Sequence, residues 1–136
     1  MGAGERHKMM DTIDMLFTTL TIRAVVITVI MIVRENGGYI VHAHPFREKA
    51  NAYRIDMIRL MPRDVDAVET YNAHSSDFQN SMAEKYADAY KLPKLCGSDN
   101  HTGVQGVFAG VEFNEKLISS ENFIKKLISE WEQLFD

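Results

Sequence analysis

The chain is poor in cysteine: among its 136 residues there is one, Cys96. A single cysteine excludes an internal disulfide framework and is typical of proteins that work in a reducing compartment. We therefore expect a cytoplasmic protein that depends on an apolar core for its stability. Because Cys96 lies in an apolar run directly before Gly97, we expect a buried structural thiol rather than a nucleophile.

Runs of basic residues are also missing. The 15 lysines and arginines are outnumbered by 19 aspartates and glutamates, which gives a formal net charge of -4. Without a basic patch or a Lys/Arg run, we expect no nucleic-acid partner. Low-complexity tracts and internal repeats are absent from the sequence as well. The whole chain, residues 1–136, is therefore expected to form a single modest domain.

One segment has almost no charge. Residues 15–33 read MLFTTLTIRAVVITVIMIV, in which Arg23 is the only charged side chain. The length approaches the roughly 20 residues of a membrane span, but a central arginine costs about 2.5–3.5 kcal/mol on insertion. A secretory signal is opposed by the lack of a small-residue cleavage site. We favour a strand at residues 21–27 and a helix at 28–36, buried within the protein or against another chain.

The rest of the chain alternates between strand-like and helix-like segments. Runs rich in apolar and β-branched residues predict strands at residues 39–43, 65–71, 93–97 and 107–113. Apolar residues at helical spacing predict helices at residues 53–60, 77–91 and 121–135, with Ser75 or Ser76 and then Ser120 as caps of the last two. This alternation predicts an α/β fold with mainly parallel strands.

Possible metal ligands follow three of the predicted strands. His44 comes after the first, His74 after the second, and Asp99 and His101 after the third. Ligands at the carboxyl ends of strands are common in α/β proteins. Asp99 and His101 are two positions apart, so they face the same side of an extended segment. Imidazole and carboxylate groups together suit Zn, Mn or Fe, which predicts a divalent metal site.

Each of these residues also has a structural interpretation. His44 can be a turn histidine held by a backbone carbonyl, and His74 can cap a surface helix. His42 is two residues before His44 and is better explained as a core residue, although it can also orient a ligand. Glu69 is a weaker candidate ligand. Arg47 either contacts a phosphate group, which its guanidinium matches in geometry, or is an exposed loop residue.

The order of these motifs resembles a known family. The segments GGYIVHAHPF, VDAVETYNAH and LPKLCGSDNHTG, within residues 32–128, resemble the PHP (polymerase and histidinol phosphatase) superfamily of metal-dependent phosphoesterases. The resemblance implies a distorted (β/α)7 barrel with up to three metals at its strand ends. It also implies that His44, Asp99 and His101 are metal ligands, and that His74 is one in some members.

The resemblance is incomplete at the amino-terminal side. The family opens with an H-x-H strand, whereas His7 is the only histidine before Tyr39. Residues 1–31 are atypical, and the chain looks like the carboxyl-terminal half of a PHP domain, a partial barrel with an incomplete metal cluster. The implied function is hydrolysis of a phosphorylated small molecule; the alternative is a non-catalytic module for metal binding or oligomer assembly. We expect a homo-oligomer, for instance a dimer, or a complementing chain to cover its open edges.

Overall fold

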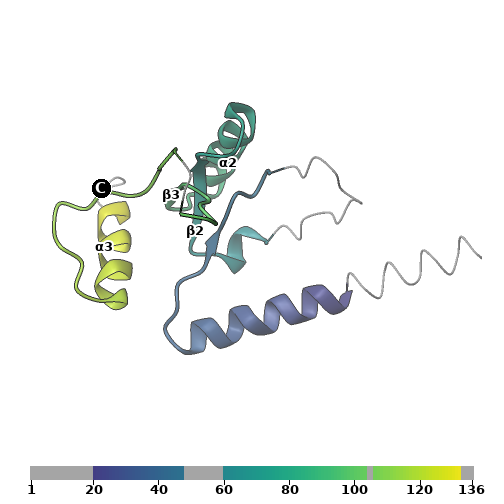
Figure 1. Cartoon of the computed structure of the whole chain (residues 1–136). Helices are drawn as coiled ribbons and strands as arrows, with labels where there is room; N and C mark the ends of the chain where they lie inside the picture. Colours follow the sequence, from purple (N-terminus) through teal and green to yellow (C-terminus); the bar gives the residue numbers. More distant parts are fainter. Residues whose placement is uncertain (1–19, 48–59, 104–105, 133–136) are drawn as a thin grey trace, which may run out of the picture. The chain divides into compact units, whose positions relative to one another are not determined.

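The computed structural model describes residues 20–47, 60–103 and 106–132 (Figure 1). It divides the chain into two compact units, Met1–Gly38 and Tyr39–Asp136. The helix predicted at residues 53–60 lies outside the described residues except for Leu60, its last residue.

Residues 20–35 of the first unit form one continuous helix, called here the amino-terminal helix. The strand predicted at residues 21–27 is therefore wrong. Valine, isoleucine and threonine lose only a few tenths of a kcal/mol each in a helix relative to better helix formers, so their enrichment is weak evidence for a strand. Thr28 also satisfies its hydroxyl inside the helix, donating to the Ala24 carbonyl at 2.9 Å. Among the described residues, no helix combines the length and the hydropathy needed to cross a bilayer.

The glycine pair ends this helix as the sequence predicts. Gly37 has φ +72°, and its N–H donates to the Arg34 carbonyl at 3.0 Å. The N–H of Gly38 donates to the Val33 carbonyl at 2.8 Å. These two bonds form a Schellman motif, in which the left-handed residue is usually glycine because it has no Cβ.

The second unit contains a parallel sheet of three strands, in the order β1-β2-β3. The strands are β1 (Val41–His42), β2 (Ala67–Asn72) and β3 (Lys94–Gly97). The mixed α/β class and the parallel pairing are confirmed. The strand predicted at residues 107–113 is wrong, because this segment is a loop in which Val107 and Phe108 are exposed. A β-branched or aromatic run forms a strand only where another strand pairs with it.

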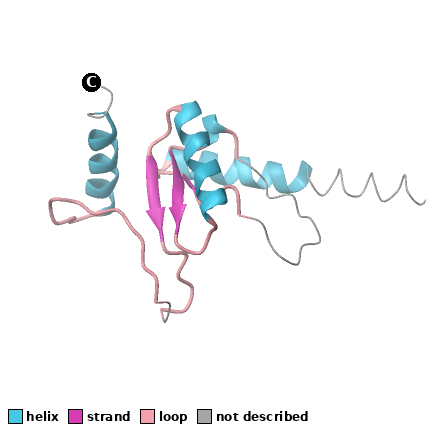
Figure 2. Ribbon diagram, turned by 90° about the horizontal axis from the view of Figure 1, so that it is seen from above, coloured by secondary structure: helices cyan, strands magenta, loops and turns pink. Residues whose placement is uncertain are grey.

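Helices cover both faces of this sheet, as Figure 2 shows. The helices are α2 (Asp77–Tyr90) and α3 (Ser120–Glu132), and a short 3-10 helix, η1 (Pro62–Asp64), precedes β2. Neighbouring β2 residues point to opposite faces, so Val68 packs on the α2 side and Ala67 on the α3 side. Both side chains are completely buried. The two clusters consist of Val65, Val68, Ala87 and Leu92, and of Ala67, Leu95 and Leu127.

Polar caps fix the ends of both covering helices. Ser76 and Gln79 form a capping box in which each side chain accepts a hydrogen bond from the other residue's backbone N–H. The cap of α3 is Ser119 rather than the predicted Ser120, since the Ser119 hydroxyl accepts from the Asn122 N–H at 3.1 Å. After α2, Lys91 adopts the left-handed conformation, with φ +53°.

The left-handed backbone of Lys91 provides a test of this fold. Replacing Lys91 by glycine removes the Cβ that is strained at this φ, and we expect the free energy of unfolding to rise by about 0.5–1 kcal/mol. Urea denaturation measures the change. Lys91→Ala is the matched control, because it removes the long side chain but keeps the Cβ, and it should stay near the wild-type value. If the free energy of unfolding rose equally in both variants, the effect would come from loss of the lysine side chain and not from relief of backbone strain.

Candidate site at the carboxyl ends of the strands

The predicted site residues lie just beyond the ends of the three strands. His44, His74 and Asp99 are each two residues past the last residue of β1, β2 and β3. Because the three strands are parallel and adjacent, these positions belong to one edge of the sheet. The shared edge that the sequence analysis expected is therefore present.

Glu69 holds this edge together. Its Oε2 atom accepts hydrogen bonds from the backbone N–H of His44 at 2.7 Å and from Nδ2 of Asn72 at 3.1 Å. Its other oxygen, Oε1, lies so close to Gly97 that a Cβ there would overlap it. A residue of the central strand thus fixes the turn after β1 and packs against the end of β3. Glu69 was only a weak candidate ligand in the sequence; the structure gives it a positioning role.

Asn72 connects the same edge to α2. Its side chain is 1% exposed, and its Oδ1 accepts from the His74 N–H at 2.9 Å. Its backbone N–H donates to Oδ1 of Asn80 at 3.0 Å, and its carbonyl accepts from Nδ2 of the same asparagine at 3.2 Å. The role of Asn80 was not predicted from the sequence. The available signal was a pair of asparagines, one at a strand end and one in the first turn of the next helix.

Asp99 carries the charged part of the site. Its side chain is 7% exposed and forms an ion pair with Nη1 of Arg47. Its Oδ1 atom lies 2.9 Å from Nε2 of His101. Arg47 and Asp99 follow different strands, β1 and β3, so this pair ties the two outer strand ends to each other. The predicted ligands Asp99 and His101 are thus in contact. Arg47 is paired with the Asp99 carboxylate and is not an exposed loop residue.

The other histidines differ in environment. His74 is exposed, and its Nδ1 lies 2.6 Å from the Ser98 carbonyl, which links the ends of β2 and β3. His42 is 8% exposed and meets the ring of Tyr86 edge to face, with centroids 6.4 Å apart. This packing supports the core interpretation of His42. The Nδ1 atom of His44 is buried and makes no hydrogen bond in the part of the chain that the structure describes.

These residues match a divalent metal in donor type but are not assembled around one. His44 offers a buried nitrogen that makes no hydrogen bond to any described residue, and Asp99 and His101 add a carboxylate and an imidazole. However, within residues 20–47, 60–103 and 106–132, no three His, Cys, Asp or Glu side chains are grouped closely enough to hold a metal ion. The carboxylate of Asp99 is paired with a guanidinium instead.

Cys96 is exposed, so the expectation of a buried thiol is wrong. Cys96 lies in β3, where successive side chains point to opposite faces of the sheet. The apolar residues around it in the sequence do not indicate to which face its side chain points. Partial desolvation, and after it the negative charge of Glu69, raise the pKa of the thiol. A raised pKa keeps the thiol protonated at neutral pH, which disfavours a nucleophilic role.

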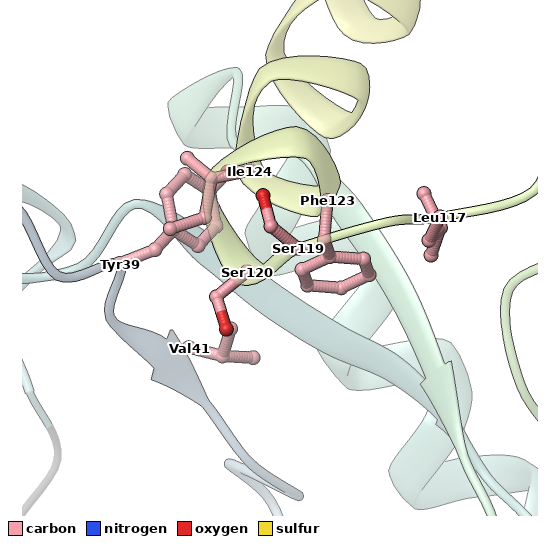
Figure 3. Close-up of a pocket in the computed structure, with 7 residues that line it drawn as sticks. All are labelled: Tyr39, Val41, Leu117, Ser119, Ser120, Phe123 and Ile124. Atoms are coloured by element: carbon pink, nitrogen blue, oxygen red, sulfur yellow. The ribbon is translucent and has the colours of Figure 1, made fainter.

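A separate apolar pocket of about 450 Å³ lies at the start of β1 and of α3 (Figure 3). Its lining is mainly aromatic and aliphatic, with the two serines of the α3 amino terminus: Tyr39, Val41, Leu117, Ser119, Ser120, Phe123 and Ile124. Tyr39 uses its hydroxyl to donate to the Asp66 carbonyl at 3.0 Å. The pocket therefore offers apolar contact and two hydroxyls, and it shares no residue with the strand-end site.

Comparison of the chain with protein-family models, with curated proteins and with solved structures finds no match.

The contact of Glu69 with Gly97 yields a prediction. In Gly97→Ala the new Cβ displaces the Glu69 carboxylate, which breaks its bonds to His44 and Asn72 and costs about 1–3 kcal/mol of stability. In a Glu69→Ala background nothing is displaced, so the same substitution should cost far less. A double-mutant cycle by urea denaturation measures this difference. Additive costs would show that Glu69 and Gly97 are not coupled.

Proposed function

We propose that the chain is the ligand-bearing, carboxyl-terminal part of a PHP-type metal-dependent phosphoesterase, which hydrolyses a phosphorylated small molecule. The observation that supports this proposal is the placement of His44, His74 and Asp99 two residues beyond three adjacent parallel strands. Such an edge is where α/β enzymes collect catalytic and metal-binding side chains.

In this proposal His44, Asp99 and His101 hold a divalent metal such as Zn, Mn or Fe, and His74 lies at the edge of the site. When bound, the metal supplies a water of lowered pKa and contacts to the phosphate oxygens. Arg47 is the side chain suited to the phosphate itself, because its guanidinium forms paired hydrogen bonds with two oxygens. Glu69 and Asn72 act through the backbone, holding the turns that carry His44 and His74.

Four candidate ligands are too few for a closed cluster of two or three metals. The opening H-x-H strand that the resemblance leads us to expect does not occur in residues 1–38, where His7 is the only histidine. We propose that a complementing chain or another copy supplies the missing ligands. The isolated chain then binds metal but hydrolyses phosphate esters weakly or not at all.

Metal binding tests this proposal directly. We expect the purified chain to bind Zn²⁺ or Mn²⁺, with affinity falling by about ten-fold or more in His44→Ala and in His101→Ala, since altering even the outer partners of a metal site costs 10–100-fold. Isothermal titration measures the affinity, and 4-nitrophenyl phosphate reports activity. His7→Ala is the matched control, because it removes a histidine outside the motifs.

Two outcomes would contradict the proposal in different ways. Equal metal affinity in all three variants would exclude the assigned ligands. Robust metal-dependent turnover by the isolated chain, abolished in His101→Ala, would show that its site is complete.

A second candidate function, oligomer assembly, is favoured by the amino-terminal helix. At 100° per residue, seven β-branched apolar residues fall on one side of this helix: Ile22, Val25, Val26, Val29, Ile30, Ile32 and Val33. The three charged side chains of the helix, Arg23, Arg34 and Glu35, lie on the remaining surface, which also carries the apolar residues Leu20, Ile27 and Met31. Ile22, Val26, Val29 and Val33 follow each other at spacings of four, three and four, the spacing of a coiled-coil seam. We propose that this side packs against the same helix of a second copy.

Light scattering on the detergent-free chain tests this assembly. We expect a dimer or larger oligomer, which Val29→Glu dissociates because it places a charge in the apolar seam. Ala24→Glu adds the same charge to the other side of the helix and should leave the oligomer intact. A stable wild-type monomer at micromolar concentration would refute the assembly, and insolubility without detergent would favour a membrane partner.

A further inference from the structure

The outer edge of β1 is open in the part of the chain that the structure describes. β1 is the first strand in the order β1-β2-β3, so only one of its sides is paired. The Ile40 carbonyl accepts from the Ala67 N–H at 3.2 Å, and Val41 is aligned with Ala67 in the parallel register. Because neighbouring residues of a strand direct their backbone groups to opposite sides, the N–H and C=O of Val41 point away from β2. They can pair with a further strand.

The apolar pocket lies beside this open edge. Val41 shares the α3 face of the sheet with its register partner Ala67, and its side chain is part of the pocket lining (Figure 3). Phe123 and Ile124 line the pocket from α3, and no charged side chain is among the described residues of the lining. Free backbone groups beside an apolar pocket are the arrangement with which a sheet edge binds an extended peptide. The backbone supplies hydrogen bonds and the pocket receives a side chain.

The chain itself contains a segment with matching chemistry. Residues 107–112 read VFAGVE, in which Val107 is 52% and Phe108 is 73% exposed. No backbone group of this segment forms a hydrogen bond with a described residue. Its valines and phenylalanine favour extended structure, and residues 107–111 are uncharged, like the pocket. A pocket of about 450 Å³ admits the ring of Phe108, since a cavity of roughly 150 Å³ accommodates benzene.

We propose that residues 107–112 of a second copy add to the open edge of β1 as an extended strand and place Phe108 in the apolar pocket. Within one chain, Phe113 holds the end of this segment against Phe123, with ring centroids 5.6 Å apart, and no residue of the segment lines the pocket. Each copy has one edge and one segment, so a two-fold axis forms both contacts and closes the assembly. This contact is independent of the proposed strand-end site and of the amino-terminal helix.

The first experiment measures binding of a peptide to the full chain. The probe is a fluorescein-labelled peptide of residues 106–112, followed by fluorescence anisotropy. We expect saturable binding, weakened about ten-fold or more when alanine replaces Phe108 in the peptide, because a buried aromatic anchor dominates such contacts. N-methylation of alternate peptide residues tests the backbone pairing. One alternate set should abolish binding and the other should preserve it, since only every second N–H of an added strand faces the edge.

Ile124→Glu tests the pocket from the side of the protein. It places a charge among apolar side chains and should lower the affinity for the peptide about ten-fold or more. Ile118→Glu is the matched control, because Ile118 is 81% exposed and lies outside the pocket lining. Circular dichroism compares the folding of both variants. If Ile124→Glu does not fold, the methylated peptides still decide, because they leave the protein unchanged.

The second experiment measures self-association of the full chain by light scattering over a dilution series. Phe108→Glu should raise the concentration at which the oligomer dissociates by about ten-fold, because a charged side chain replaces the apolar anchor. Phe78→Glu is the control, since Phe78 is 72% exposed and lies outside both the segment and the pocket. It should leave the association unchanged.

The outcomes separate the candidate occupants of the pocket. Peptide binding that Ile124→Glu weakens, together with weaker self-association of Phe108→Glu, supports the proposal. Peptide binding that Ile124→Glu leaves unchanged overturns it. Pocket-dependent peptide binding with unchanged association of Phe108→Glu overturns the second copy as the occupant and favours a segment of another protein. Absence of peptide binding overturns the proposal, and binding of 1-anilinonaphthalene-8-sulfonate that Ile124→Glu abolishes would then favour a small apolar ligand.

Discussion

The carboxylate of Glu69 is the contact on which the strand-end site depends. It comes from the central strand, holds the backbone of His44 after β1 and lies against Gly97 at the end of β3. A partly buried carboxylate is stable when it accepts hydrogen bonds. Glu69 accepts one from the backbone N–H of His44 and one from the buried side-chain amide of Asn72. The size of residue 97 and the direction of the turn after β1 are therefore set by the same side chain.

Two non-glycine residues of this edge adopt positive φ angles, His44 with +31° and Asp99 with +50°. Such a conformation costs of order 1–3 kcal/mol and persists only where the surroundings enforce it. His44 at this position donates its N–H to Glu69, and Asp99 is paired with Arg47. Both strained positions belong to the residues that the proposed function assigns to a metal. Backbone strain of this kind is frequent at functional sites.

The sequence predicted those parts of the molecule that local patterns specify. The three paired strands, the capping box at Ser76 and the glycine end of the amino-terminal helix all follow from short motifs with one stable geometry. Predictions failed where the outcome depends on a distant partner. The segment 107–113 has β-forming residues, but no strand of the described residues pairs with it. Residues 21–27 are rich in β-branched side chains, yet the cost of these side chains in a helix is small enough for one continuous helix to form.

Within the site, the sequence indicated that Asp99 and His101 lie together, but it did not indicate which cation pairs with Asp99. The positions of His44, Asp99 and His101 follow from strand ends, which composition and spacing reveal. The pairing of Arg47 with Asp99 depends on a turn direction that Glu69 fixes from another strand, and no local pattern encodes it. This pairing also changes the interpretation of Asp99 as a metal ligand. A nearly buried carboxylate that already has a cation beside it is no vacant metal ligand.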